Sequence, residues 1–243
     1  MSACSMRSVG DNLPSIETDR PEQMVSIAAK ALLLDLDGTL VDSTTAVESA
    51  WRWAAEQLGV PFSQIAPYVH GIPTEQALEL AIPGIDGVTR AQLADEILTR
   101  QVESNADVVA MPGALRLLNR LPAGSWAVVT SGSVRLAESS IRKAGLPEPP
   151  ILITAEDVQA GKPNPEPFMR AMGVLDVSSE ECIVIEDSPH GIASGRAAGV
   201  RVLAVGTTFP PHLLDHANWL IPNLEKITVT SQADQLCLSW GAW

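Results

Sequence analysis

Short apolar runs alternate with stretches of helical periodicity along most of this chain. Helical patterns cover 134–144, 166–172 and 192–198, and a glycine follows each one, as is usual where a helix stops in a left-handed conformation: Gly145, Gly173 and Gly199. Five apolar runs have the length of buried strands: 31–36, 126–130, 151–154, 182–185 and 201–205. Strands that alternate with helices predict an α/β fold with a Rossmann-like parallel sheet, covered by helices on both faces.

One long segment, 45–111, interrupts this alternation. It has helical periodicity but no convincing strand, and it lies between the first and second predicted strands. We therefore expect a helical cap inserted into the sheet domain, and Pro112-Gly113 marks the return to the core. The predicted organisation is a mobile N-terminal extension (1–24), an α/β core domain (25–44 and 112–243) and a helical cap domain (45–111). The tryptophan-containing tail, 231–243, could dock on the core or on a second subunit.

Composition and charge limit the classes of partner and the compartment that we expect for this protein. The 243 residues carry a formal net charge of −13, which argues against nucleic acid or an anionic membrane as a partner. No apolar stretch reaches the ~18–20 residues of a membrane span, and the first 21 residues lack the apolar stretch of a signal peptide. Three scattered cysteines suit a reducing compartment. We expect a cytoplasmic protein that is a monomer or a weak homodimer.

The first candidate for chemistry is the pair Asp35 and Asp37, directly after the first strand. Parallel sheets place their ligand sites at this edge, and alternate side chains there point the same way. Two acids in one crevice repel each other unless a cation such as Mg²⁺ holds them. One carboxylate can then act as a nucleophile and the other as a general acid and base. A solvated acidic turn is the alternative interpretation.

Three further motifs follow later strands or lie in braced loops. Thr130-Ser131-Gly132 offers a hydroxyl and backbone N–H groups to phosphate oxygens. A proline-braced loop, 161–165, presents Lys162 as a point charge together with Asn164. Glu186 and Asp187 follow the fourth strand and have the oxygen ligands that Mg²⁺ prefers, although Asp187 or Ser188 could instead cap the next helix. Each of these motifs alone is modest evidence for a phosphate or metal site, but the four motifs in this order are specific for one.

Together the four motifs resemble those of the haloacid dehalogenase-like superfamily, with a small helical cap after the first. The similarity runs from about Lys30 to Val229, and the segments 126–133, 153–167 and 186–199 look like those of sugar-phosphate and glycerol-phosphate phosphatases. The resemblance implies that Asp35 is the nucleophile and that Asp37 is the general acid and base. It implies these Mg²⁺ ligands: Asp35, the backbone carbonyl of Asp37, Asp187, and Glu186 directly or through water. It implies these substrate contacts: Thr130, Ser131, Gly132, Lys162, Asn164 and, from the cap, His70 and Gly71.

The expected function is Mg²⁺-dependent hydrolysis of a small sugar or polyol phosphate through an aspartyl-phosphate on Asp35. A cation would also explain how an acidic protein binds an anionic metabolite. Two alternatives remain open: a sugar phosphomutase of the beta-phosphoglucomutase type, and a non-catalytic phosphate- or metal-binding regulator. A dehalogenase is disfavoured because a carbon–halogen substrate gives Asp37 no alkoxide to protonate. His70 either contacts the substrate or is an ordinary loop histidine.

Overall fold

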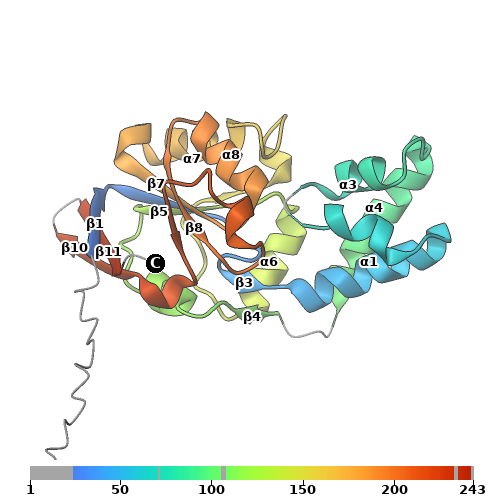
Figure 1. Cartoon of the computed structure of the whole chain (residues 1–243), viewed down its shortest axis with the longest axis horizontal. Coiled ribbons are helices and arrows are strands. Elements are labelled where there is room, and N and C mark those ends of the chain that lie inside the picture. The colour runs from blue at the N-terminus through green and yellow to red at the C-terminus, as the bar shows by residue number, and fades with distance from the viewer. Residues whose placement is uncertain (1–23, 71, 105–107, 233–234, 242–243) are drawn as a thin grey trace, which may run out of the picture.

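Six parallel strands form the central sheet, in the order β6-β5-β2-β7-β8-β9 (Figure 1). The computed structural model describes residues 24–70, 72–104, 108–232 and 235–241. The predicted α/β fold is confirmed, and β9 is a strand that the sequence pattern did not reveal. The strands are β2 (Ala31–Leu34), β5 (Trp126–Val129), β6 (Leu152–Ile153), β7 (Cys182–Glu186), β8 (Arg201–Val205) and β9 (Trp219–Ile221).

Both faces of this sheet are buried, which explains why its strands are apolar throughout. All four residues of β2 are buried, and Leu32 and Leu34 pack on one face while Ala31 and Leu33 pack on the other. Residues of α5 and α6 belong to the first of these apolar clusters, and residues of α7 and α8 to the second. These helices are α5 (Ala114–Leu118), α6 (Val134–Lys143), α7 (Glu166–Leu175) and α8 (Pro189–Ala197).

The predicted glycine stops hold for two of the three helices. Gly145 and Gly199 have φ of 65° and 76°, directly after the turns that end α6 and α8. The prediction for Gly173 was wrong, because this residue lies inside α7, which continues to Leu175. Asp176 takes the left-handed conformation there, with φ 54°. Asp is one of the few residues with a side chain that tolerates this conformation, so a glycine was not needed.

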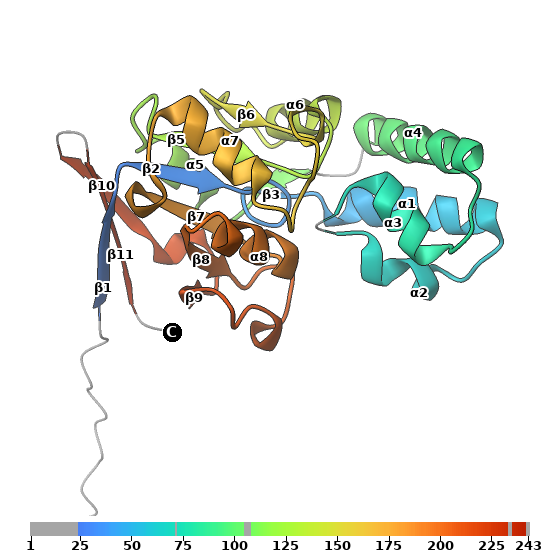
Figure 2. The same cartoon turned by 90° about the horizontal axis from the view of Figure 1, so that it is seen from above.

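Four helices form a separate body, which lies beside the sheet (Figures 1 and 2). They share an apolar cluster of their own, which includes Trp51, Ile65, Leu78 and Ile97. A two-stranded antiparallel ladder of β3 and β4 lies where the chain enters and leaves this body, so the segment predicted as purely helical also contains a short strand. These elements are β3 (Val41–Asp42), α1 (Thr44–Leu58), α2 (Phe62–Ile65), α3 (Thr74–Ala81), α4 (Gly87–Glu103) and β4 (Val109–Ala110).

A second, antiparallel sheet joins the two ends of the described chain, in the order β1-β11-β10. Trp240 is buried in the core and its ring meets that of Trp219 edge to face, with 5.6 Å between the centroids. The described part of the tail, 231–232 and 235–241, therefore docks on the core of its own chain, and Trp243 lies outside the described residues. The first strand begins at Met24, the last residue of the predicted extension, and residues 1–23 lie outside the described residues. The strands are β1 (Met24–Ala29), β10 (Thr228–Gln232) and β11 (Gln235–Gly241).

Single 3₁₀ turns complete the secondary structure. None of the helices in the described ranges is long and apolar enough to cross a membrane. The turns are η1 (Ala66–Tyr68), η2 (Ala155–Asp157), η3 (Ser179–Glu181), η4 (Pro211–Leu213) and η5 (Leu224–Lys226).

Candidate active site

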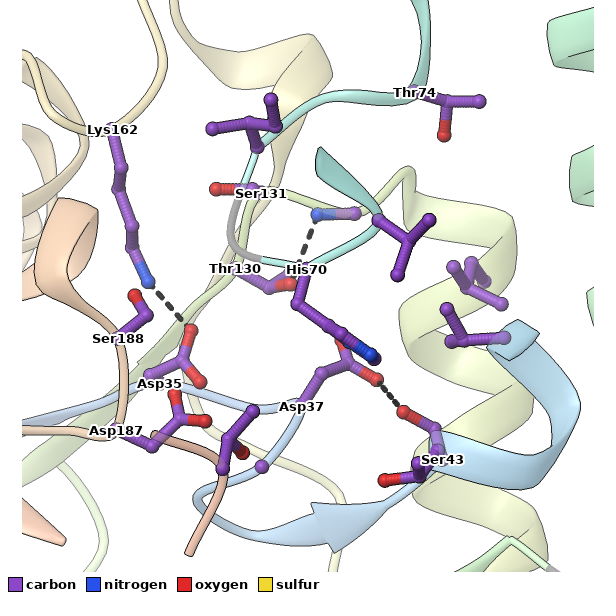
Figure 3. A pocket seen from close by; sticks show the side chains of 18 of the residues that line it. Asp35, Asp37, Ser43, His70, Thr74, Thr130, Ser131, Lys162, Asp187 and Ser188 are labelled. Atoms are coloured by element: carbon purple, nitrogen blue, oxygen red, sulfur yellow. Dashed lines mark hydrogen bonds and ion pairs between the residues drawn. The ribbon is translucent and has the colours of Figure 1, made fainter. Parts of the chain in front are cut away.

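The ends of three neighbouring strands bring the predicted acidic and hydroxyl residues together. Asp35 follows β2, Thr130 follows β5, and Asp187 follows β7, and all three line one cavity (Figure 3). Parallel pairing sets their height along the sheet, because Leu34 lies opposite both Val128 and Ile185. The carboxyl edge of the sheet is therefore the place where the separate motifs meet, as the sequence predicted.

A tight turn after Asp35 brings a second carboxylate to the cavity. Gly38 has φ of 86°, and its N–H donates to the Val41 carbonyl at 2.8 Å. A Cβ at this glycine would overlap the Asp187 carboxylate, so the turn lies directly against the end of β7. The Asp37 carboxylate accepts a hydrogen bond from Ser43 Oγ at 2.6 Å, and burial raises its pKa.

Lys162 lies at the centre of the site, and its three ammonium hydrogens all have acceptors. It donates to Asp35 Oδ1 at 2.6 Å, to Glu186 Oε1 at 2.8 Å and to the Val129 carbonyl at 2.9 Å. Its side chain is only 2% exposed. Burial disfavours the charged form, but the attraction of Asp35 and Glu186 outweighs this and holds the Lys162 pKa above its ordinary value. A phosphate oxygen could approach this ammonium only by sharing or replacing one of these partners.

Glu186 serves mainly to hold its neighbours in place. One carboxylate oxygen accepts from Lys162, and the other accepts from Ser188 N–H at 2.7 Å and Ser188 Oγ at 3.0 Å. Ser188 in turn caps α8 by accepting from Gly191 N–H at 3.1 Å. Both oxygens of Glu186 therefore already accept hydrogen bonds, whereas Asp187 is not tied to Lys162 in this way.

Two helical glycines test how tightly Glu186 is enclosed. An added Cβ at Gly191 in α8 would overlap the Glu186 carboxylate, while at Gly173 in α7 it would meet nothing. Gly191→Ala should lower the free energy of unfolding by about 1–3 kcal/mol through overpacking. Gly173→Ala should raise it by about 0.5–1 kcal/mol, because glycine inside a helix costs backbone entropy. Urea unfolding of both variants measures this, and equal effects would contradict the tight packing.

The four carboxylates of the cavity outnumber its cations. Burial, with repulsion from Glu186 and Asp37, raises the pKa of Asp35 to about 7 against the opposing attraction of Lys162. Burial and repulsion from Glu186 and Asp35 raise the pKa of Asp187 well above its usual range. Oxygens of Asp35, Glu186 and Asp187 lie within 4.8 Å of one another. Buried, crowded carboxylates with raised pKa values are the donor set that a divalent cation would stabilise, so the residues fit a metal ion.

The helical body supplies the other wall of the cavity. His70 lines the cavity and lies beside Asp37 in Figure 3, and burial lowers its pKa against the attraction of Asp37 and Glu48. Gly71 lies outside the described residues. Sequence reasoning had not assigned these further lining residues to a site: Ser43, Thr44, Val47, Trp51, Val69, Ile72, Thr74, Gln101, Leu136, Ser188 and Thr208. Ser43 lies close to the first motif, and Ser188 belongs to the fourth, where it was considered only as a helix cap. Little in the local sequence distinguishes the others.

Most of the predicted phosphate-binding residues line the cavity, but Asn164 does not. Ser131 and Gly132 line the cavity, and Ser131 Oγ is buried without a hydrogen-bond partner among the described residues. Thr130 Oγ1 accepts from Gly132 N–H at 3.0 Å. Asn164 does not line the cavity: its side chain accepts from Glu166 N–H at 3.0 Å and its carbonyl from Ser194 Oγ at 2.6 Å. The structure therefore gives Asn164 a part in the loop before α7 and does not bring it to the site.

Comparison with known proteins agrees with this geometry. The family model of the haloacid dehalogenase-like hydrolases matches residues 32–205, from the first core strand to the fifth predicted one. The chain belongs to this family. The resemblance of the four motifs is thereby confirmed. The matched region excludes β1, β10 and β11, so the second sheet lies outside what the family model describes.

Individual relatives of this haloacid dehalogenase-like hydrolase are phosphatases. Hexitol phosphatase A of Escherichia coli is 38% identical over 209 residues, which cover 84% of this chain and 95% of that protein. Glycerol-1-phosphate phosphohydrolase 2 of Saccharomyces cerevisiae is 32% identical over 84% of this chain and 86% of its own length. At these identities the predicted enzyme class, a phosphoric monoester hydrolase, is confirmed. A solved beta-phosphoglucomutase from Clostridium difficile shares the fold, with a TM-score of 0.73 at 21% identity, covering 82% of this chain and 93% of that one.

Proposed function

We propose that this enzyme hydrolyses the phosphate ester of a small sugar or polyol, with Mg²⁺ and through an aspartyl-phosphate on Asp35. The observation that carries the proposal is the position of the Asp35 carboxylate, which lies in the cavity with one oxygen bonded to Lys162 at 2.6 Å. This contact fixes the orientation of the carboxylate and leaves its other oxygen for attack on phosphorus. The names of the two phosphatase relatives, a hexitol phosphatase and a glycerol-1-phosphate phosphohydrolase, support the substrate class.

Asp37 is proposed as the general acid and base. Its raised pKa favours the protonated carboxyl that donation to a leaving alkoxide requires. As the Asp35 oxygen bonds to phosphorus, the ester P–O bond breaks and the alkoxide takes the Asp37 proton. Water then attacks phosphorus and gives a proton to Asp37. This attack breaks the bond between Asp35 and phosphorus, releases inorganic phosphate and restores the Asp35 carboxylate. The hydrogen bond from Ser43 Oγ orients Asp37 for both transfers.

The remaining residues neutralise charge on the phosphoryl group. Asp35 and Asp187 would hold Mg²⁺ together with the Asp37 backbone carbonyl, and Glu186 would contribute by fixing Lys162. When bound, the cation supplies electrostatic stabilisation to the phosphoryl oxygens. The Ser131 hydroxyl, which has no partner among the described residues, and the Lys162 ammonium provide further donors to the phosphoryl group.

We propose the domain division that the sequence suggested, with a core domain (25–44 and 112–243) and a cap domain (45–111). The separate apolar cluster of the four helices and the β3–β4 ladder at their base support it. The cap wall of the cavity, with His70 and Ile72, would contact the leaving group and exclude water during the transfer from Asp35.

The charge of the cavity favours a phosphatase over a phosphomutase. Lys162 is the single lysine or arginine among the described residues that line it, and Asp35 and Glu186 already pair with this ammonium. A mutase that passes through a sugar bisphosphate needs compensation for a second phosphate dianion. The described cap wall offers only His70, whose pKa is lowered, so a substrate with one phosphate fits better.

A panel of phosphate esters tests the proposed function. Incubation with hexitol, glycerol and hexose phosphates plus Mg²⁺ should release inorganic phosphate, and excess EDTA should lower the rate by at least about 10²-fold because the crowded carboxylates lose their counter-charge. Colorimetric phosphate detection gives the rate, and added Mg²⁺ should restore it. Stoichiometric conversion of a sugar 1-phosphate to its isomer would support the mutase instead. Metal binding with no turnover of any ester would support the regulator.

A further inference from the structure

Helix α4 carries a polar residue at a position where its pattern calls for an apolar one. Leu93, Ile97 and Gln101 are spaced four residues apart, so they lie along one face of the helix. All three are buried, and Leu93 and Ile97 belong to the apolar cluster of the helical body. Gln101 continues this stripe to the wall of the active-site cavity, where it is 6% exposed.

The Gln101 side chain makes no hydrogen bond to another residue that the structure describes, although its amide can donate two bonds and accept two. Its amide atoms are not fully enclosed by protein, so they open onto the cavity. The same wall of the cavity carries apolar side chains such as Val47 and Val69 beside polar ones such as Thr74. An amide at this place gains no hydrogen bond from another described residue, whereas a leucine or methionine would continue the apolar stripe of Leu93 and Ile97. Departures from an expected apolar pattern, such as a glutamine in a buried stripe, occur mainly at functional sites.

A second glutamine of the helical body, Gln64, is exposed but forms a hydrogen bond within the protein. Gln64 on α2 donates from Nε2 to the Ala81 carbonyl at 3.0 Å and does not line the cavity. Its amide ties the end of α3 to α2. Gln101 makes no comparable bond to a described residue, so its amide is left for a molecule that enters the cavity.

We propose that Gln101 is a specificity-determining residue that hydrogen-bonds a hydroxyl of the leaving group, and that this group is uncharged and hydroxylated. This inference rests on the proposed function. An amide pairs with a hydroxyl as both donor and acceptor, and in a buried cavity it discriminates strongly against an analogue that lacks the hydroxyl. The excess of carboxylates in the same cavity disfavours an anionic leaving group.

The test compares matched esters with and without hydroxyls on the purified enzyme with Mg²⁺. The pairs are glycerol 1-phosphate with 1-propyl phosphate, and sorbitol 6-phosphate with 1-hexyl phosphate. The wild type should prefer a polyol ester over its alkyl partner in kcat/KM. Gln101→Met, which nearly keeps the length and helix propensity of glutamine, should reduce this preference by about tenfold or more. Its melting temperature should be equal to or above that of the wild type, because the substitution breaks no hydrogen bond to a described residue.

Gln64→Met serves as the control in the same body. It should leave the polyol preference unchanged and lower the melting temperature, since the Ala81 carbonyl loses its donor. A polyol preference in the wild type that Gln101→Met leaves within twofold would overturn the assignment, and so would a lower melting temperature with the preference intact. Absence of phosphate release from every ester by the wild type would instead overturn the proposed function.

Discussion

Replacing Asp35 with Asn should lower kcat by about 10⁴-fold or more, since removal of a nucleophile eliminates the covalent route and leaves only binding and electrostatic effects. The protein should remain folded. The buried carboxylate has its pKa raised to about 7, so its charge is disfavoured by its surroundings, and a neutral isostere keeps its shape. Lys162 retains its contacts with Glu186 and the Val129 carbonyl. We therefore expect the free energy of unfolding to change by less than about 2 kcal/mol.

The measurement combines steady-state phosphate release with urea unfolding and mass spectrometry of acid-quenched enzyme. The wild type should show a substoichiometric mass gain of one phosphoryl group during turnover, and Asp35→Asn should show none. Asp42→Asn is the matched control, because Asp42 lies nearby on β3, accepts from Thr44 N–H at 3.1 Å and does not line the cavity. The asparagine side chain in this variant can still accept the hydrogen bond from Thr44 N–H, so the control should keep both stability and turnover. An Asp35→Asn enzyme with near-normal kcat would exclude Asp35 as the nucleophile.

Replacing Lys162 with Met should have the largest effect on stability. The ammonium is the shared partner of Asp35 and Glu186, at 2.6 Å and 2.8 Å, and both carboxylates are buried. Removing one member of a buried ionic group leaves uncompensated charge and costs about 3–5 kcal/mol. Turnover should also fall by about 10²–10³-fold, because a preorganised donor to the phosphoryl group is lost. Urea unfolding and phosphate release measure the two effects.

Two companion variants separate charge from packing. Adding Glu186→Gln to Lys162→Met removes one of the stranded carboxylates and should recover about 1–2 kcal/mol of the loss without restoring turnover. Lys30→Met removes a surface pair with Glu181, in which the lysine is 47% exposed, and should cost less than about 1 kcal/mol. Equal losses for Lys30→Met and Lys162→Met would show that burial does not strengthen the central pair.

The second sheet shows that periodicity alone does not reveal which distant segments pair as strands. Strands β1 and β11 pair from Met24↔Gly241 to Ala29↔Leu236, so residues at opposite ends of the chain complete each other. Neither strand can bury its apolar face by itself. The pattern at 236–240 does alternate, with Leu236, Leu238 and Trp240 buried, but only the folded chain supplies a partner strand and a core for them.

The short-range pattern by itself determined five of the six core strands, the order of the motifs, and the position of Asp35 and Asp187 at one edge of the sheet. These features depend on local sequence and on the general geometry of parallel sheets, which holds for any chain of this pattern. Tertiary structure decided the rest. In the folded chain both Glu186 oxygens accept hydrogen bonds from Lys162 and Ser188. Asn164 bonds within its own loop and does not line the cavity, whereas Gln101 does. These outcomes depend on which distant groups satisfy each buried polar atom, and chain spacing does not specify that.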